Sequence, residues 1–282
     1  YVSTTQFWLP VFDHPQDKAT FDCRFTVPAG KAVASNGTLQ LHQPDNGTDI
    51  YEWTHKIPCA TYLLTFAADD YLMREVQGCR VPVVYFTLAS DTSASEYAYR
   101  MLPKAVEAFE GKFVPYPFEK VGYVNTVLGS MEHQTMVSSA VDVIRNMYST
   151  QDALGSIPPH ELSHHWFGDL VTCRDFRDAW LNEGFASFCE GIWYEYWRGF
   201  ESGFLRRMND RLSTYINYAV KSEGAVPLYD FPRDQISNYP ETVYSKGAGF
   251  FGMLRYALGD SLFFGAIKKY LTDLAFSNAT TD

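Results

Sequence analysis

The chain has 282 residues, 46% of them hydrophobic and 20% charged, which is the composition of a globular protein with one large domain or two smaller ones. Its formal net charge is −10 and it contains no run of lysine or arginine, so we expect no nucleic-acid partner. No apolar stretch reaches the length of a membrane span, so we expect a soluble chain, while neither its compartment nor its oligomeric state is indicated.

Residues 1–88 predict strands and hairpins, because short alternating or apolar runs such as TFDCRFTVPAG and RVPVVYFTL are separated by Pro and Gly. Asn36, Asn46 and Asn278 each begin an Asn-x-Thr sequence, but the first two are also Asn-Gly pairs, for which we favour hairpin turns over glycosylation. From SASEYAYRMLPKAVEAFEGKF onward, apolar residues recur every three or four positions, as in a helix. We therefore predict an α+β fold, with a β-rich domain portion at residues 1–88 and a mainly helical domain at residues 89–282.

Within the second part, the β-branched segment KVGYVNTVLGSMEHQTMVSSAVDVI predicts strands. A helix is expected next in PPHELSHHWFGDL, with Ser156 as its N-cap and Gly168 at its end. RDAWLNEGFASFCEGIWYEYWRG predicts a long amphipathic helix that ends near Gly199, and three or more helices should follow it.

The HExxH spacing in PPHELSHHWFGDL predicts a metal site. A helix advances about 100° per residue, so His160 and His164 project about 40° apart, whereas His165 points away and is expected not to bind metal. Two imidazoles placed in this way can share a zinc ion, with Glu161 between them as general base toward water. The alternative is a chance pattern on a surface helix.

Two imidazoles leave a zinc ion incompletely coordinated, so a third protein ligand is required. Glu183 in WLNEGFASF is the best candidate, because it lies 19 residues after His164 on the next predicted helix. The alternative is a first-turn glutamate that only complements the helix dipole. Glu190 lies about two turns further along the same face, where it could orient a ligand histidine or be an ordinary exposed or core-edge residue.

Four segments occur in order, HELSHHWFGDLVT and WLNEGFASF with GSMEHQTM upstream and VYSKGAG downstream, and together they resemble the gluzincin aminopeptidases of the aminopeptidase N family. WLPVFDHPQDKATFDCRFTVP and TYLLTFAADDY resemble that family's N-terminal β domain, so the resemblance covers most of the chain. It implies a thermolysin-like, mainly helical catalytic domain after the β domain, a zinc-dependent aminopeptidase activity and one zinc ion per chain.

The resemblance also implies a role for each matching residue. His160, His164 and Glu183 would be the zinc ligands, and Glu161 would take the proton of the attacking water and pass it to the leaving amine. Tyr244 in VYSKGAG matches the family tyrosine whose hydroxyl stabilises the oxyanion of the tetrahedral intermediate.

Substrate recognition is implied for the segment GSMEH. Glu132 matches the glutamate that binds the free α-ammonium group of a peptide. A carboxylate about 4 Å from an ammonium contributes roughly 4 kcal/mol at an effective dielectric near 20, before desolvation, which distinguishes a free N-terminus from a blocked one. Gly129, Ser130 and Met131 would offer backbone groups to the extended peptide.

The chain departs from the family pattern in several places. The usual GAMEN reads GSMEH, with Ser130 and His133 in place of Ala and Asn. A histidine beside Glu132 that titrates near pH 6.5 would weaken substrate affinity at lower pH. No glutamate precedes WLPVFDHP, where the family has a second amine-binding glutamate, and the family's domains extend beyond both ends of this sequence, so we expect a fragment of a longer protein.

These features predict a zinc metallo-aminopeptidase that hydrolyses N-terminal residues from peptides. An endopeptidase or an epoxide hydrolase on the same scaffold is an alternative, although Glu132 argues against the former and the latter would need a long apolar channel. A catalytically silent peptide-binding relative should have lost a ligand or the base, and the sequence retains them all. The preferred N-terminal residue and the natural substrate are not indicated.

Overall fold

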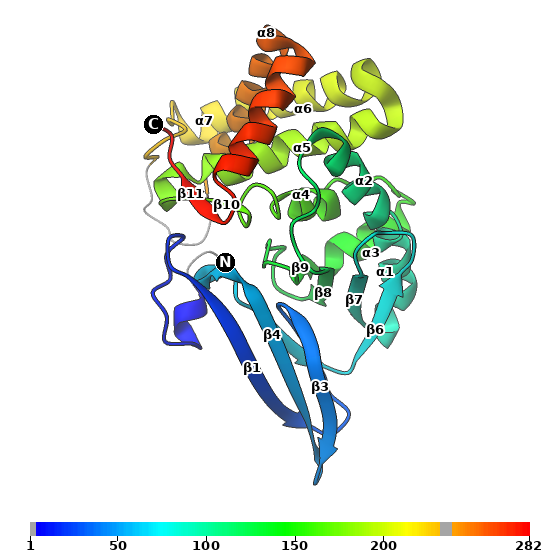
Figure 1. Cartoon of the computed structure of the whole chain (residues 1–282). Coiled ribbons are helices and arrows are strands. Elements are labelled where there is room, and N and C mark those ends of the chain that lie inside the picture. Colours follow the sequence, from blue (N-terminus) through cyan, green and yellow to red (C-terminus); the bar gives the residue numbers. More distant parts are fainter. Residues whose placement is uncertain (1–3, 232–238) are drawn as a thin grey trace.

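The computed structural model describes residues 4–231 and 239–282, and it has the predicted α+β architecture (Figure 1). The strands are β1 (Lys18–Pro28), β2 (Ala32–Ser35), β3 (Thr38–Asp45), β4 (Thr48–Ala60), β5 (Phe66–Asp69), β6 (Tyr71–Val76), β7 (Val83–Leu88), β8 (Val121–Thr126), β9 (Val137–Ala140), β10 (Val171–Cys173) and β11 (Ser277–Ala279). The helices are α1 (Thr92–Tyr99), α2 (Leu102–Lys112), α3 (Val141–Ser149), α4 (Ile157–Ser163), α5 (Trp180–Gly199), α6 (Arg206–Thr214), α7 (Val220–Glu223) and α8 (Glu241–Asp273).

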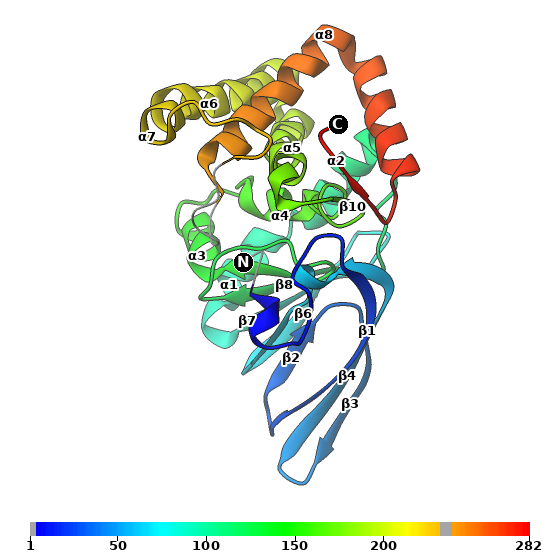
Figure 2. The same cartoon turned by 90° about the vertical axis from the view of Figure 1, so that its left-hand side faces the viewer.

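The first part of the chain forms an antiparallel sheet in the order β1-β4-β3, which projects away from the helices (Figure 2). Asn46 and Gly47 connect β3 to β4 with φ of 44° and 87°, so the hairpin predicted at this Asn-Gly pair is confirmed. Asn36 and Gly37 also form a turn, but β2 pairs with β5 rather than with β3, so no hairpin forms there. Asn36 is only 3% exposed, and its buried amide donates hydrogen bonds to the backbone oxygens of Leu63 and Gln134.

A four-stranded sheet in the order β6-β7-β8-β9 lies between this β-rich part and the helices. β6 pairs antiparallel with β7, whereas the pairs β7–β8 and β8–β9 are parallel. The connection from β7 to β8 runs through α1 and α2, as a parallel pair requires a long crossover. The sheet therefore takes strands from both sides of residue 88, and the domain boundary at that position stays a prediction.

The HExxH segment forms the short helix α4, which begins where predicted but ends earlier. Ser156 stands at the N-cap position, but its side chain makes no capping hydrogen bond. The helix ends at Ser163 instead of Gly168, because the backbone that follows it forms tighter turns, in which His165 N–H donates to Leu162 O at 3.1 Å and Trp166 N–H donates to Ser163 O at 3.0 Å. His164 keeps helical φ and ψ of −58° and −25°, so its side chain still projects beside the preceding turn.

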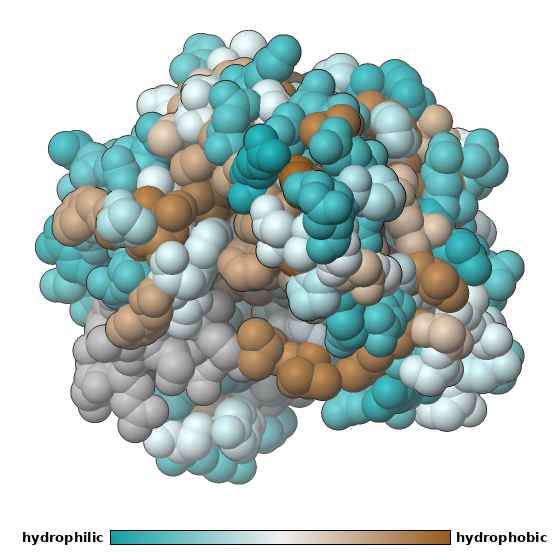
Figure 3. Space-filling model, turned by 90° about the horizontal axis from the view of Figure 1, so that it is seen from below, coloured by the Kyte–Doolittle hydropathy of each residue, from teal (hydrophilic) through white to brown (hydrophobic). Residues whose placement is uncertain are grey.

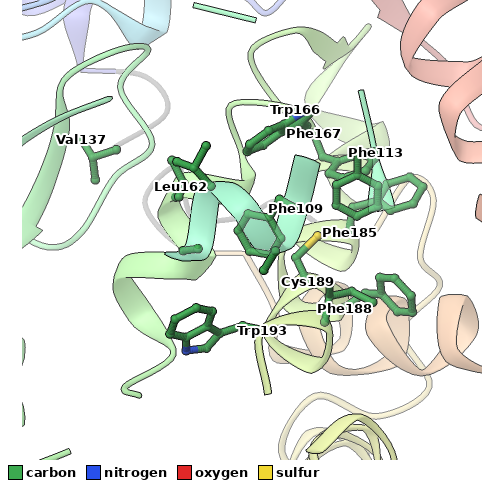
Figure 4. Packing of buried hydrophobic residues seen from close by; sticks show 14 of the residues in the cluster. Phe109, Phe113, Val137, Leu162, Trp166, Phe167, Phe185, Phe188, Cys189 and Trp193 are labelled. Atoms are coloured by element: carbon green, nitrogen blue, oxygen red, sulfur yellow. The ribbon is translucent and has the colours of Figure 1, made fainter. Parts of the chain in front are cut away.

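The largest hydrophobic core lies between α2, α4, α5 and the sheet (Figure 4). Leu162 on α4 and Trp166 just after it are fully buried against Phe109 and Phe113 of the α2 region, and the Trp166 indole N–H donates to Val114 O at 2.9 Å. Because one side of α4 is fixed in this core, its histidines are presented on the other side.

Helix α5 ends at Gly199, as predicted, where φ is +74°. It crosses α8 at Gly184 and Gly247, where a Cβ added to Gly247 would lie 2.8 Å from the Gly184 Cα. Glu183 precedes the first of these glycines and Tyr244 lies one turn before the second, so the close crossing brings both side chains toward α4.

No helix in the described ranges is both long and apolar enough to cross a membrane. Seen from below, the surface carries several hydrophobic patches that are interspersed with hydrophilic residues (Figure 3). The most exposed large apolar side chains include Val127 at 93%, Tyr256 at 86% and Phe7 at 82%, and they come from separate segments of the chain.

We expect Gly247→Ala to destabilise the protein by about 1–3 kcal/mol, because the added methyl group meets the α5 backbone and the helices must separate. Gly265→Ala is the matched control, since it lies in the helical stretch of α8 beyond the break at Gly259, with no atom within 4 Å of an added Cβ, and it should stabilise by up to about 1 kcal/mol. Urea unfolding measures both changes. Equal effects of the two substitutions would contradict the close crossing.

Candidate metal centre

The predicted ligand side chains of α4 and α5 come together in the structure. His160 Nε2 lies 3.3 Å from His164 Nε2, and the Glu183 Oε2 atom lies 3.5 and 3.3 Å from these two nitrogens. All three residues are buried. Glu183 is therefore a partner of both histidines, although its position in the first turn of α5 also suits the helix dipole.

These three atoms fit a tetrahedral zinc ion. Bonds of about 2.0–2.1 Å to imidazole nitrogen and carboxylate oxygen, at tetrahedral angles, place neighbouring ligand atoms roughly 3.3–3.4 Å apart. The three observed separations of 3.3–3.5 Å match that spacing. His160, His164 and Glu183 can thus hold the ion and leave one position open, which is the arrangement of catalytic zinc sites.

The charges around the centre also suit a cation. Burial alone lowers the pKa of an imidazole, but the hydrogen bonds that His160 donates to the carboxylates of Glu183 and Glu190 raise its pKa to about 9. His164 likewise has a pKa raised well above 6.5, because the charges of Glu132 and Glu183 outweigh its burial. In the metal-free protein, protons on the histidines therefore balance the carboxylates, and a metal ion would replace them.

Glu190 fixes the orientation of His160, which is one of the two roles considered from the sequence. Its Oε1 atom lies 2.9 Å from His160 Nδ1, so the imidazole presents Nε2 to the centre. Arg207 and Arg211 on α6 bind the same carboxylate, and their charges with that of His160 hold the Glu190 pKa far below its usual range despite complete burial. Glu190 is therefore a charged, fully bonded partner of the candidate ligand His160.

Glu161 and Tyr244 lie beside the ligands. Burial raises the pKa of Glu161 to about 7, although the neighbouring imidazoles lower it. The Tyr244 ring faces that of His160 with centroids 6.5 Å apart, and burial together with the charges of Glu183 and Glu132 raises the pKa of its hydroxyl well above 10. The Glu161 carboxylate can thus exchange a proton near neutral pH, while the Tyr244 hydroxyl stays protonated.

Glu132 reaches the centre from the loop between β8 and β9. One ligand-type atom each of Glu132, Glu161 and His164 lies within 4.8 Å of the others, and all three residues are buried. Met131 is held just before it, because its N–H and C=O both pair with Ser138 at 3.0 Å. A cavity of about 560 Å³ is lined by Gly129, Ser130 and Met131 together with Trp8 and Phe66. Among the residues that the structure describes, the candidate metal ligands do not line this cavity.

His133 and His165 do not behave as titrating or metal-binding groups. Burial lowers the pKa of His133 to about 3, and its Nδ1 lies 3.0 Å from Ser138 Oγ. The expectation that His133 titrates near pH 6.5 is therefore wrong, because its imidazole is enclosed instead of facing solvent. His165 bonds Tyr116 at 2.8 Å on the core side of α4, away from the described groups that could hold a metal, as its helical position predicts.

Arg207 and Arg211 are the supporting residues that the sequence did not reveal. They lie four residues apart in GFLRRMNDRLSTYINYAV, which places them on one face of a helix. That spacing indicates a shared partner but does not identify Glu190, because the partner depends on how α6 packs against α5.

The fold and the site define a gluzincin-type metallopeptidase. Residues 96–282 match the Peptidase family M1 domain, and residues 4–63 match the Peptidase M1 N-terminal domain. The chain belongs to peptidase family M1. The resemblance found in the sequence motifs is thereby confirmed.

Several relatives show how this chain compares with longer family members. It is 25% identical to a leucyl aminopeptidase of Saccharolobus solfataricus, over 99% of this chain and 38% of that protein. It is 26% identical to an alanine/arginine aminopeptidase of Saccharomyces cerevisiae, over 100% of this chain and 35% of that protein. The chain thus spans less than two-fifths of the length of these relatives, which agrees with the expected fragment of a longer protein.

Solved structures show the same fold. An M1 zinc metallopeptidase from Deinococcus radiodurans aligns with a TM-score of 0.83 and 26% identity, over 98% of this chain and 61% of that chain. A mutant of it bound to a Tyr-Ser-Ala substrate aligns with a TM-score of 0.81 and 25% identity, over 95% and 60% of the two chains.

Glu190→Gln should weaken zinc binding by about 10–100-fold. The neutral amide is a weaker acceptor for the His160 Nδ1–H, so the tautomer that presents Nε2 is less favoured and Nε2 is less basic. Competition with a chromogenic chelator measures the affinity. Glu195→Gln is the matched control on the same helix, since that carboxylate pairs with Arg255 instead of a ligand. Unchanged affinity in the Glu190 variant would contradict its supporting role.

Zinc binding should release protons at pH 7, because both ligand imidazoles have raised pKa values and only neutral imidazoles bind the ion. The neutral fraction falls as the pH drops below the His160 pKa of about 9, so zinc affinity should fall by at least about tenfold per pH unit between pH 8 and 6. Calorimetry in buffers of different ionisation enthalpy counts the protons. His133→Asn should leave the slope unchanged, and zinc binding without proton release would contradict the charge balance.

Proposed function

We propose that the chain is the catalytic part of a zinc aminopeptidase that removes single residues from peptide N-termini. The observation that carries the proposal is that two buried clusters share His164. In the first cluster His164 lies with His160 and Glu183, and in the second it lies with Glu161 and Glu132. The first group suits a metal ion with an open position, and the second adds a base and an ammonium-binding carboxylate.

The relatives support the same activity. Similar proteins include a leucyl, an alanine/arginine and a glutamyl aminopeptidase, and one similar solved structure holds the tripeptide substrate Tyr-Ser-Ala. Peptides with a free N-terminus are therefore the substrate class that we assign to this chain.

Each side chain has a chemical task in the proposed reaction. When bound, zinc supplies Lewis acidity at the scissile carbonyl and lowers the pKa of water. Glu161 accepts a proton from the attacking water and donates it to the leaving amine, which its pKa of about 7 suits. Tyr244 keeps its proton and donates a hydrogen bond to the carbonyl oxygen as negative charge develops there.

Glu132 gives the proposed reaction its exopeptidase character. Its carboxylate is buried, so an α-ammonium group bound to it is attracted more strongly than in water. Burial raises the Glu132 pKa, while the charge of His164 lowers it. An approaching ammonium group would favour the ionised form further, and a blocked N-terminus would leave this carboxylate without a cationic partner.

The proposal is tested by initial rates with leucyl- and alanyl-p-nitroanilide, each with a free and an N-acetylated amine. Zinc-loaded protein should cleave only the free-amine substrates, and a chelator should abolish the cleavage. Glu161→Gln should lower kcat by about 10²–10⁴-fold and still bind zinc, because it removes the base but no ligand. Equal cleavage of acetylated substrates would contradict amine recognition, and inactive zinc-loaded protein would favour a silent peptide-binding relative.

A further inference from the structure

The loop that carries Glu132 turns through an unfavourable backbone conformation. Thr135 has a φ of +63°, in the left-handed region that β-branched residues rarely adopt. The N–H of Met136 donates to His133 O at 2.9 Å, so Thr135 occupies the third position of a tight turn, where a positive φ usually calls for glycine. A threonine at this position needs contacts that hold it there.

Those contacts come from the β-rich part of the chain. The Gly37 N–H donates to Thr135 Oγ1 at 2.8 Å, and the Asn36 amide donates to Gln134 O at 2.6 Å. The Gln134 side chain in turn lies 2.8 Å from His55 Nε2 on β4. Asn36, Gln134, Thr135 and His55 are each at most 3% exposed, so solvent does not compete for these bonds.

The turn formed by Ser35, Asn36 and Gly37, called here the 35–37 turn, is itself rigid. Gly37 has a φ of +78°, and a Cβ on it would lie 2.2 Å from the Thr54 carbonyl oxygen, so only glycine fits. The Asn36 side chain also donates to Leu63 O at 3.0 Å and accepts from the Thr65 N–H at 2.7 Å.

A buried lysine completes the support. Lys120, which lies just before β8, donates to Ser35 O at 3.0 Å and also to Gly37 O. The 35–37 turn is thus tied to the start of β8, while its own N–H and amide groups hold the loop that follows β8. The loop carrying Glu132 is therefore fixed by a part of the chain distant in sequence.

We propose that Thr135 is a positioning residue for Glu132, which it holds in place through its hydrogen bond to the 35–37 turn. The inference rests on the proposed function, because it assigns the strained turn to recognition of the substrate ammonium. The Met131–Ser138 pairing fixes the loop before Glu132, and Thr135 fixes it three residues after. Between these two points the Glu132 carboxylate has little freedom to move away from an ammonium group.

Thr135→Val tests the inference, because valine keeps the shape and branching of threonine but cannot accept the Gly37 N–H. We expect KM for leucyl-p-nitroanilide to rise about tenfold and kcat to fall less than about threefold, since an interaction in substrate binding is weakened. Thr135→Ser keeps the acceptor and should restore KM to within about twofold of the wild type. Hydrogen exchange of residues 131–136 should become faster only in the valine variant.

Thr87→Val is the matched control. Thr87 is also fully buried, lies on β7 in the four-stranded sheet and loses hydrogen bonds to Ser95 and Asn125 when replaced, whereas its hydroxyl is not bonded to the loop that carries Glu132. It should lower stability without raising KM or loop exchange. A tenfold rise of KM in this control, or a wild-type KM in Thr135→Val, would overturn the positioning role.

The experiments distinguish a failure of the proposed aminopeptidase activity from a failure of the positioning role of Thr135. Wild-type protein without chelator-sensitive cleavage would contradict the aminopeptidase activity itself, whatever the Thr135 variants do. In that case hydrogen exchange still tests whether Thr135 attaches the loop to the 35–37 turn. Faster exchange at residues 131–136 in Thr135→Val alone supports the attachment of the loop to the 35–37 turn, and unchanged exchange refutes it.

Discussion

The close contact of Glu183 with two buried imidazoles is the interaction on which the rest of the site depends. A carboxylate and two histidines enclosed together are stable only when positive charge balances the negative charge, because burial penalises every unpaired ion. In the metal-free protein, protons on His160 and His164 supply that charge, as their raised pKa values indicate. The same requirement makes the centre a strong site for a divalent cation, which carries the charge without occupying the imidazole nitrogens with protons.

The surrounding helices supply further charged groups that balance the charge of the centre. Glu190 holds the far nitrogen of His160, and two arginines from α6 neutralise Glu190 in turn. The charges therefore alternate along this chain of contacts, so His160 and Glu190 each have a partner of opposite sign. The glycine contact between α5 and α8 permits this arrangement, because a larger residue at Gly184 or Gly247 would separate the helices that carry Glu183 and Tyr244.

The β-rich part contributes to the site through the loop that follows β8. Its 35–37 turn contacts the residues just after Glu132, and the four-stranded sheet spans the two parts of the sequence. The ligands on α4 and α5 and the carboxylate on the loop therefore rest on different supports.

The sequence by itself determined the family and predicted the candidate residues of the site. The spacing of His160, Glu161 and His164 follows from helical geometry alone, and the ordered motifs predicted Glu183 and Tyr244 and identified the family. The long helix ending at Gly199 and the hairpin at Asn46 were predicted for the same reason, since local backbone preferences decide them. The tertiary structure alone decided the role of Glu190, the neutral state of His133 and the attachment of Thr135 to Gly37. These depend on burial and on partners from 5 to 98 residues away, and no local pattern in the sequence specifies which distant group will lie beside a given side chain.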